Sequence, residues 1–185
     1  MNRTTKLQHL LVAAVAAVLL VSPVAHAGPE APSDVPGAVR VEPGHKVFLV
    51  GHAVGVQIYT CAATSTGFAW GLVAPRADLF DAKGKLLATH YGGPTWQALD
   101  GSTVVGQRVD GVNVDPAAID WLLLSARSTS VGTDGDRLTA TTFIQRTNTT
   151  GGRAPAASTC NSGTVGTTAE VPYTADYHFW KATGR

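Results

Sequence analysis

Residues 90–96 contain three side chains that can bind a ligand, His90, Tyr91 and Trp96, on either side of a Gly-Gly-Pro turn at 92–94. The two glycines can adopt positive φ angles, and the proline stiffens the chain that leaves the turn. Aromatic rings at an exposed loop present flat apolar faces with polar tips, which suit stacking on a sugar or a small planar molecule. A plain hairpin packed into the core would use the same residues, so the burial of Tyr91 and Trp96 decides between the two.

A second candidate pair, Asp176 and His178, lies near the C-terminus. Residues two apart on a β-strand project to the same face, so this pair can ligate a metal or act as a base with its orienting carboxylate. A surface hydrogen bond is the simpler alternative. We expect one aromatic cleft, lined by His178 together with Tyr59, Tyr173, His90, Tyr91 and Trp96.

The sequence contains none of the common nucleophile or metalloprotease motifs: no Gly-x-Ser-x-Gly, no His-Glu-x-x-His and no phosphate-binding loop. Pairs among Asp78, Asp81, Asp100 and Glu170 have the chemistry for glycoside hydrolysis, but the sequence sets no distance between them. We therefore assign no catalytic residue, metal or cofactor. The favoured function is binding of a glycan or small molecule in the aromatic-lined cleft. A hydrolase that uses His and Asp groups there is the alternative, with a structural envelope protein as a third.

The first 27 residues are typical of a secretory signal peptide. Arg3 and Lys6 precede an apolar run at 10–21, and Ala-His-Ala at 25–27 fits a cleavage site. The apolar run is shorter than the roughly 20 residues that a membrane-spanning helix needs. We therefore predict a secreted protein, extracellular or periplasmic, with no membrane anchor after cleavage.

Cleavage after residue 27 would leave 185 − 27 = 158 residues, which is the size of one domain. Residues 28–38 hold three prolines and no apolar period, which predicts a flexible leader followed by a single β-rich domain at 39–185. The signal peptide holds two of the 14 Lys and Arg residues and none of the 13 Asp and Glu residues, so the mature balance is 12 − 13 = −1. A near-neutral chain without a basic cluster is a poor partner for nucleic acid or anionic membranes, and we expect neither.

Cys61 and Cys160 are the two cysteines of the chain, and both follow the predicted cleavage site. Two cysteines in an oxidising compartment most often form one disulfide. A zinc site is the alternative, but the chain lacks the Cys-x-x-Cys pairs that such sites use. We predict a disulfide between Cys61 and Cys160.

Short apolar stretches alternate with turn residues along the mature chain, and no window has sustained helical periodicity. Residues 46–50 and 53–59 are predicted as separate strands, and residues 138–147 as one of the clearest late strands. Residues 148–169 are rich in Thr, Ser, Gly and Ala and are predicted as a long loop held by Cys160. About ten short strands predict a single all-β domain, an antiparallel β-sandwich or barrel-like fold with long loops and one disulfide.

Several segments carry a resemblance to a known family: His-Ala-Val-Gly-Val-Gln-Ile-Tyr-Thr-Cys at 52–61, Thr-His-Tyr-Gly-Gly-Pro-Thr-Trp at 89–96, Ile-Gln-Arg-Thr-Asn-Thr at 144–149, Gly-Gly-Arg-Ala-Pro at 151–155 and Val-Pro-Tyr-Thr-Ala-Asp-Tyr at 171–177. Together they resemble the secreted fungal and bacterial family filed as domain of unknown function 3455. The resemblance implies an extracellular, β-rich protein and no particular reaction. Some fungal members carry a malate dehydrogenase label, but this chain has neither a Gly-x-Gly-x-x-Gly motif nor a βαβ pattern to bind a nicotinamide. We do not expect that activity.

Overall fold

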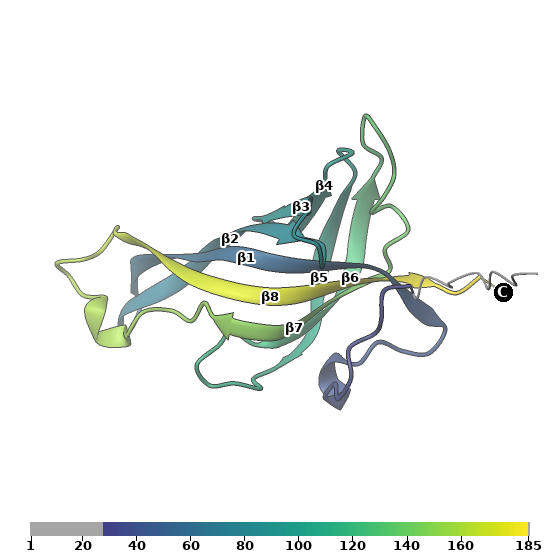
Figure 1. Ribbon diagram of the computed structural model, residues 1–185. Helices are drawn as coiled ribbons and strands as arrows, with labels where there is room; N and C mark the ends of the chain where they lie inside the picture. Colours follow the sequence, from purple (N-terminus) through teal and green to yellow (C-terminus); the bar gives the residue numbers. More distant parts are fainter. Residues whose placement is uncertain (1–27, 185) are drawn as a thin grey trace, which may run out of the picture.

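The computed structural model describes residues 28–184 and contains eight β-strands in one closed antiparallel ring (Figure 1). Each strand lies beside its neighbours in sequence, and β8 closes the ring by pairing with β1. The predicted all-β fold is confirmed, and of its two forms the structure is the barrel. The predicted signal peptide, residues 1–27, lies outside the described residues. The elements are η1 (Gly37–Val39), β1 (His45–Thr64), β2 (Gly67–Phe80), β3 (Leu86–Tyr91), β4 (Thr95–Ala98), β5 (Thr103–Val112), β6 (Trp121–Ser130), β7 (Phe143–Gly151), η2 (Ala157–Thr159) and β8 (Thr168–Ala182).

Pairing between β1 and β8 closes the ring along most of both strands, from His45 opposite Ala182 to Thr60 opposite Thr168. Successive side chains of a strand point to opposite faces, so a closed ring divides them into an inner and an outer set. The inner set of β8 is buried and consists of Tyr173, Ala175, Tyr177 and Phe179. Directly paired residues point to the same face, so the pairing carries this inner face from β8 to each of the other strands. It therefore determines which of their side chains enter the barrel.

Two glycines of β1 leave room for the neighbouring strand β2 on the inner side of the ring. A Cβ at Gly51 would lie 2.8 Å from Cδ2 of Leu79, and a Cβ at Gly55 would collide with the backbone of Arg76. Both glycines therefore let β2 pass close to β1, and neither one ends the strand. The two short strands predicted on either side of Gly51 are thus a single strand, which is one reason why the barrel has fewer and longer strands than predicted.

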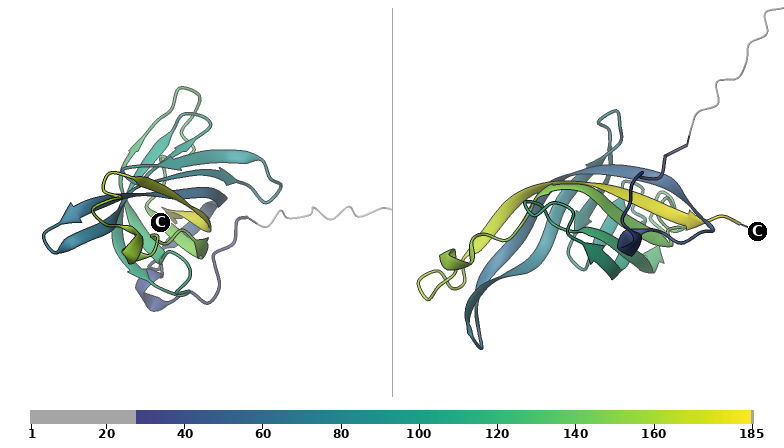
Figure 2. Two further views of the ribbon diagram at one scale, coloured as in Figure 1. Left: turned by 90° about the vertical axis from the view of Figure 1, so that its left-hand side faces the viewer. Right: turned by 90° about the horizontal axis from the view of Figure 1, so that it is seen from below.

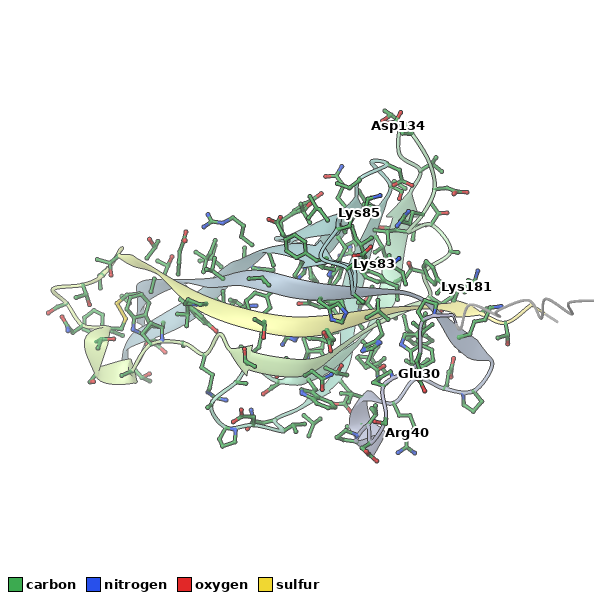
Figure 3. The ribbon with its side chains drawn as sticks, in the orientation of Figure 1. Glu30, Arg40, Lys83, Lys85, Asp134 and Lys181 are labelled. Atoms are coloured by element: carbon green, nitrogen blue, oxygen red, sulfur yellow. A yellow bond between two sulfur atoms is a disulfide. The ribbon has the colours of Figure 1, made fainter. Side chains whose placement is uncertain are left out.

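The N-terminal segment around η1 covers the outer face of β5 to β8 (Figure 3, where Glu30 and Arg40 mark the segment). Val39 is buried against Leu123, and its carbonyl accepts a 2.7 Å hydrogen bond from Nε2 of Gln145. The other members of this outer cluster are Val35, Val41, Val112, Trp121, Phe143 and Trp180. The barrel therefore has one hydrophobic cluster inside the ring and a smaller one outside it.

The loop before β8 is shorter than predicted. β7 continues to Gly151 and β8 begins at Thr168, so the loop spans residues 152–167 instead of 148–169. Threonine is β-branched and packs well on a pleated sheet, so the Thr-rich stretch after residue 147 extends β7. A register shift between Thr147 and Thr150 accommodates it against β8.

The strand predicted at 138–147 begins later, at Phe143. Leu138 is fully buried, and its carbonyl accepts hydrogen bonds from the N–H and the hydroxyl of Thr141. Its own N–H donates to Oγ of Ser102 at 3.1 Å. Residues before Phe143 therefore form a buried turn that anchors the β6–β7 loop to the barrel.

The β1–β2 hairpin extends beyond the barrel as an arm, residues 60–71 (Figures 1 and 2). Cys61 and Cys160 form a disulfide, with their Cα atoms 5.4 Å apart, which confirms the predicted bridge. Nearby, Nε1 of Trp70 donates a 3.0 Å hydrogen bond to Oγ1 of Thr159. The arm is thus joined to the loop before β8 by a covalent bond and by side-chain hydrogen bonding.

Replacing Cys160 by serine should lower the unfolding midpoint markedly. The disulfide joins residues 99 apart in sequence, and removing a cross-link of that span costs up to about 4.7 kcal/mol in the chain-entropy account. Thermal or denaturant unfolding of parent and variant measures the effect. Reductant should bring the parent to the midpoint of Cys160→Ser and leave the variant unchanged; equal midpoints without reductant would show that the bond contributes little.

Candidate functional site

An open pocket of about 560 Å³ enters the barrel at the end from which the arm projects. Residues 72–75 of β2, directly after the arm, form one side, and Gly93 and Pro94 of the β3–β4 turn form the other. The wall between them includes Gln57, Tyr59, His90, Trp96, Leu122, Leu124 and Tyr177. The pocket therefore contains the inner-facing residues of most strands at this end of the ring.

The deep wall of the pocket is an aromatic cluster centred on Trp96. The His90 ring stacks on the Trp96 ring with centroids 4.1 Å apart and planes 5° from parallel. Tyr177 meets both rings edge-on, at 5.2 Å from His90 and 5.3 Å from Trp96. Trp96 is 1% exposed and His90 is 3% exposed, and the indole N–H of Trp96 has no acceptor among the described residues. The burial of Trp96 therefore favours the hairpin packed into the core, although the ring also forms part of the pocket wall.

The tight β3–β4 hairpin explains why His90 and Trp96 meet. They are direct cross-strand partners, and cross-strand partners point to the same face of a sheet. Gly93 adopts a φ of 87° in the turn between them, as the Gly-Gly-Pro sequence predicted. Nδ1 of His90 donates a 2.9 Å hydrogen bond to the carbonyl of Thr95. In the neutral ring, Nε2 is then left with its lone pair as an acceptor.

Burial strongly perturbs the ionisation of His90. Loss of hydration lowers its pKa to about 3, with the charge of Arg146 acting in the same direction and the bond to Thr95 opposing it. The imidazole is therefore neutral at physiological pH. A ring with so low a pKa is poorly matched to proton abstraction near neutrality.

Two further predicted residues, Tyr59 and Tyr173, belong to the same interior. The hydroxyl of Tyr59 donates a 2.7 Å hydrogen bond to the carbonyl of Gly152, whose φ is 76°. Tyr173 is 2% exposed, and its hydroxyl lies 3.5 Å from that of Tyr177. Burial raises the pKa of Tyr59 and of Tyr173, so both phenols keep their protons. Tyr59 lines the pocket, whereas Tyr173 does not.

The structure places Tyr91 and His178 apart from this site. Tyr91 follows an inner-facing residue, so it points outward and is 39% exposed. His178 follows the inner-facing Tyr177, and it is buried on the outer side of the sheet, with Nε2 3.2 Å from Oγ1 of Thr147. Burial lowers the pKa of His178, although the nearby carboxylate of Asp176 opposes the shift. His90 and the Asp176–His178 pair therefore lie on opposite faces of the barrel wall.

Asp176 is instead paired with His52 on the outer face of the barrel. Nδ1 of His52 lies 2.6 Å from Oδ1 of Asp176, and Nδ2 of Asn148 donates a 2.8 Å hydrogen bond to Oδ2. The surface partner of Asp176 is therefore His52, and not the His178 that the sequence analysis paired with it. Within residues 28–184, no three His, Cys, Asp or Glu side chains are grouped so as to hold a metal ion.

Sequence analysis did not single out the three arginines that line the pocket: Arg108, Arg146 and Arg153. They come from β5, β7 and the loop before β8, so only the closed ring brings them together. The sequence could have pointed to two of these arginines, because Arg146 and Arg153 lie in segments that carry the family resemblance. Among the described residues that line the pocket, Asp120 is the single carboxylate.

The buried neutral His90 predicts a loss of stability in acid. Between the ordinary histidine pKa of about 6.5 and the folded value of about 3, the unfolded chain binds a proton that the folded chain does not. The free energy of unfolding should therefore fall as the pH falls through this window, by up to about 1.4 kcal/mol per pH unit from this residue.

The variant His90→Asn keeps an N–H donor for the carbonyl of Thr95 but cannot titrate, so its free energy of unfolding should fall less steeply in acid. Denaturant unfolding between about pH 4 and 7 measures the slope. His45→Asn, which removes a histidine outside the barrel interior, is the matched control, and its slope should be steeper than that of His90→Asn. Equal slopes in parent and His90→Asn would contradict the assigned ionisation.

The described residues contain no helix long and apolar enough to cross a membrane.

A family model described as "Protein of unknown function (DUF3455)" matches residues 42–181. Neither the curated proteins nor the solved structures give a match. The matched range runs from just before β1 to near the end of β8, and it includes every residue named in the pocket. The chain therefore belongs to this family of proteins of unknown function.

Proposed function

We propose that the protein is a secreted binding module that takes a small organic molecule into the end of its barrel. The observation that carries this proposal is the open pocket of about 560 Å³ with an aromatic and aliphatic wall. Small-molecule sites are typically concave, mostly apolar and roughly 300–1,000 Å³ in volume, with a few placed polar groups. Here the polar groups include the hydroxyl of Tyr59, the imidazole of His90 and the arginines at the wall.

A compact ligand with an apolar body fits the pocket better than a glycan does. Sugar binding by stacking needs an open aromatic face. One face of Trp96 is covered by His90, and the ring is 1% exposed. Tyr91, the more exposed of the two aromatics at the turn, points away from the pocket. The aromatic wall is therefore suited to enclosing an apolar group.

The hydrolase alternative has less support from the geometry. It required His and Asp groups in one cleft, but Asp176 and His178 lie on the outer face of the barrel, across the wall from His90. The single carboxylate among the described pocket residues, Asp120, lies 3.9 Å from Nη2 of Arg108. His90 itself is neutral and donates through Nδ1 to a backbone carbonyl. Secretion is supported by the signal-peptide pattern of residues 1–27 and by a disulfide, a bond that persists in oxidising compartments.

Narrowing the pocket should abolish ligand binding without unfolding the protein. Ala74 and Ala154 line the pocket from two sides, so Ala74→Trp combined with Ala154→Trp places two indoles at its opening. A screen of small aromatic, aliphatic and sugar ligands, followed by tryptophan fluorescence and thermal shift, should give hits for the parent that the double variant loses.

The matched control is Ala82→Trp, which makes the same change in the exposed β2–β3 turn, outside the pocket. It should bind each hit as the parent does. Hits that bind the folded double variant and the parent equally well would place binding elsewhere and overturn the proposed site.

A further inference from the structure

The pocket carries an excess of positive charge. Arg108, Arg146 and Arg153 line it, and Asp120 is the single carboxylate among its described lining residues, so the local balance is 3 − 1 = +2. His90 adds no charge because it is neutral. The chain as a whole has a formal net charge of +1, including the predicted signal peptide. The pocket is therefore positive in a protein that is otherwise close to neutral.

Backbone carbonyls, which do not neutralise charge, hold two of these arginines in place. Nε and Nη2 of Arg146 donate to the carbonyl of Asp120 at 3.0 and 2.8 Å. Nη1 of Arg153 donates to the carbonyl of Ala118 at 3.2 Å. These bonds orient each guanidinium at the pocket wall and leave its full charge uncompensated.

The third arginine, Arg108, is only weakly paired. Its Nη2 lies 3.9 Å from Oδ2 of Asp120, beyond hydrogen-bonding distance, and both side chains are more than one-third exposed. Exposed pairs of this kind contribute about 0–1 kcal/mol. A ligand anion can therefore compete with this carboxylate for the guanidinium of Arg108.

Each arginine also keeps free donors. A guanidinium has five N–H groups in a planar fork that matches a carboxylate, sulfonate or phosphate. Within residues 28–184, no acceptor bonds Nη1 of Arg146, and none bonds Nε or Nη2 of Arg153. These groups are available to an acidic ligand.

The charge of the arginines reaches into the aromatic wall. Arg146 and Arg153 each lower the pKa of Tyr59 against the effect of burial, and Arg146 also acts on His90 and Tyr173. Low-dielectric walls concentrate the field of charged groups in a cleft. An anion in this pocket would therefore be attracted more strongly than one at an open surface.

We propose that the ligand of this pocket is an amphipathic organic anion, with one acidic group bound by the arginines and an apolar body packed against the aromatic wall. Arg108 and Arg153 are exposed, whereas Trp96 and Tyr177 are fully buried. The acidic group therefore lies toward the opening and the apolar body lies inward. This inference rests on the proposed function, because it names the chemical class of the molecule that the pocket binds.

Two dyes with the same apolar body test the inference. Anilinonaphthalene sulfonate (ANS) carries a sulfonate, and N-phenyl-1-naphthylamine (NPN) has the anilinonaphthalene body without it. Both become fluorescent in an apolar site, so titration of the folded parent gives a dissociation constant for each. We expect ANS to bind at least about tenfold more tightly than NPN, since hydrogen bonds to charged groups contribute about 1.5–3 kcal/mol. Added salt should weaken ANS binding and leave NPN binding unchanged.

Substitution of the exposed arginines separates charge from structure. Arg108→Gln and Arg153→Gln should each weaken ANS binding several-fold, and together by more than about tenfold, while NPN binding and the unfolding midpoint stay as in the parent. Arg137→Gln, at an exposed residue outside the pocket, is the matched control and should change neither dye. If the arginines serve only to anchor the loops, both dyes will respond alike.

The outcomes distinguish this inference from the proposed function. Equal, salt-independent binding of both dyes in the pocket, lost together in the Ala74→Trp, Ala154→Trp double variant, would overturn the anionic class and leave small-molecule binding intact. Failure of both dyes to bind the folded parent would overturn the inference, and the wider ligand screen would then decide the proposed function alone.

Discussion

Closure of the ring by β8 against β1 is the constraint on which the rest of the structure depends. β8 pairs with β1 on one side and β7 on the other, so the barrel has an inside that its own side chains must fill. Interiors are close-packed, and a large aromatic side chain on one strand requires small residues opposite or beside it. Gly51, Ala53 and Gly55 supply that space along β1, where the neighbouring β2 brings in Leu79 and Ala77. Larger residues at these positions would push β2 away and open the ring.

Unequal strand lengths explain why the barrel is filled at one end and open at the other. β3 and β4 have six and four residues, whereas β1 has 20 and β2 has 14. β2 pairs with β3 only from Ala77 onward, so the barrel wall extends further on the β1–β2 side than on the other side, where it ends at the β3–β4 turn. The pocket lies where the wall changes height. Residues 72–75 form its high side, and Gly93 and Pro94 form its low rim. The disulfide then ties the overhanging arm to the loop before β8.

Turn motifs and the cysteine count predicted part of the structure. The Gly-Gly-Pro turn implied a hairpin, which is enough to bring His90 and Trp96 together. Two cysteines implied one disulfide. Strand alternation also placed Asp176 and His178 on one face, but it could not say whether that face was inside, because that depends on closure. Strand number was overestimated because a glycine beside a closely packed neighbour has the same sequence signal as a glycine in a turn.

The charged side of the pocket could not be predicted from local pattern, since Arg108, Arg146 and Arg153 meet only through the ring. The chemistry of this side of the pocket follows from the backbone groups that hold the arginines. A barrel interior tolerates charge where polar groups satisfy it, and here carbonyls from residues 118 and 120 hold guanidinium groups in place without cancelling them. Beside them, burial keeps His90 and the tyrosines neutral. One wall thus has permanent charge, and the other consists of uncharged rings. Such a division is suited to holding a molecule that is itself polar at one end and apolar at the other.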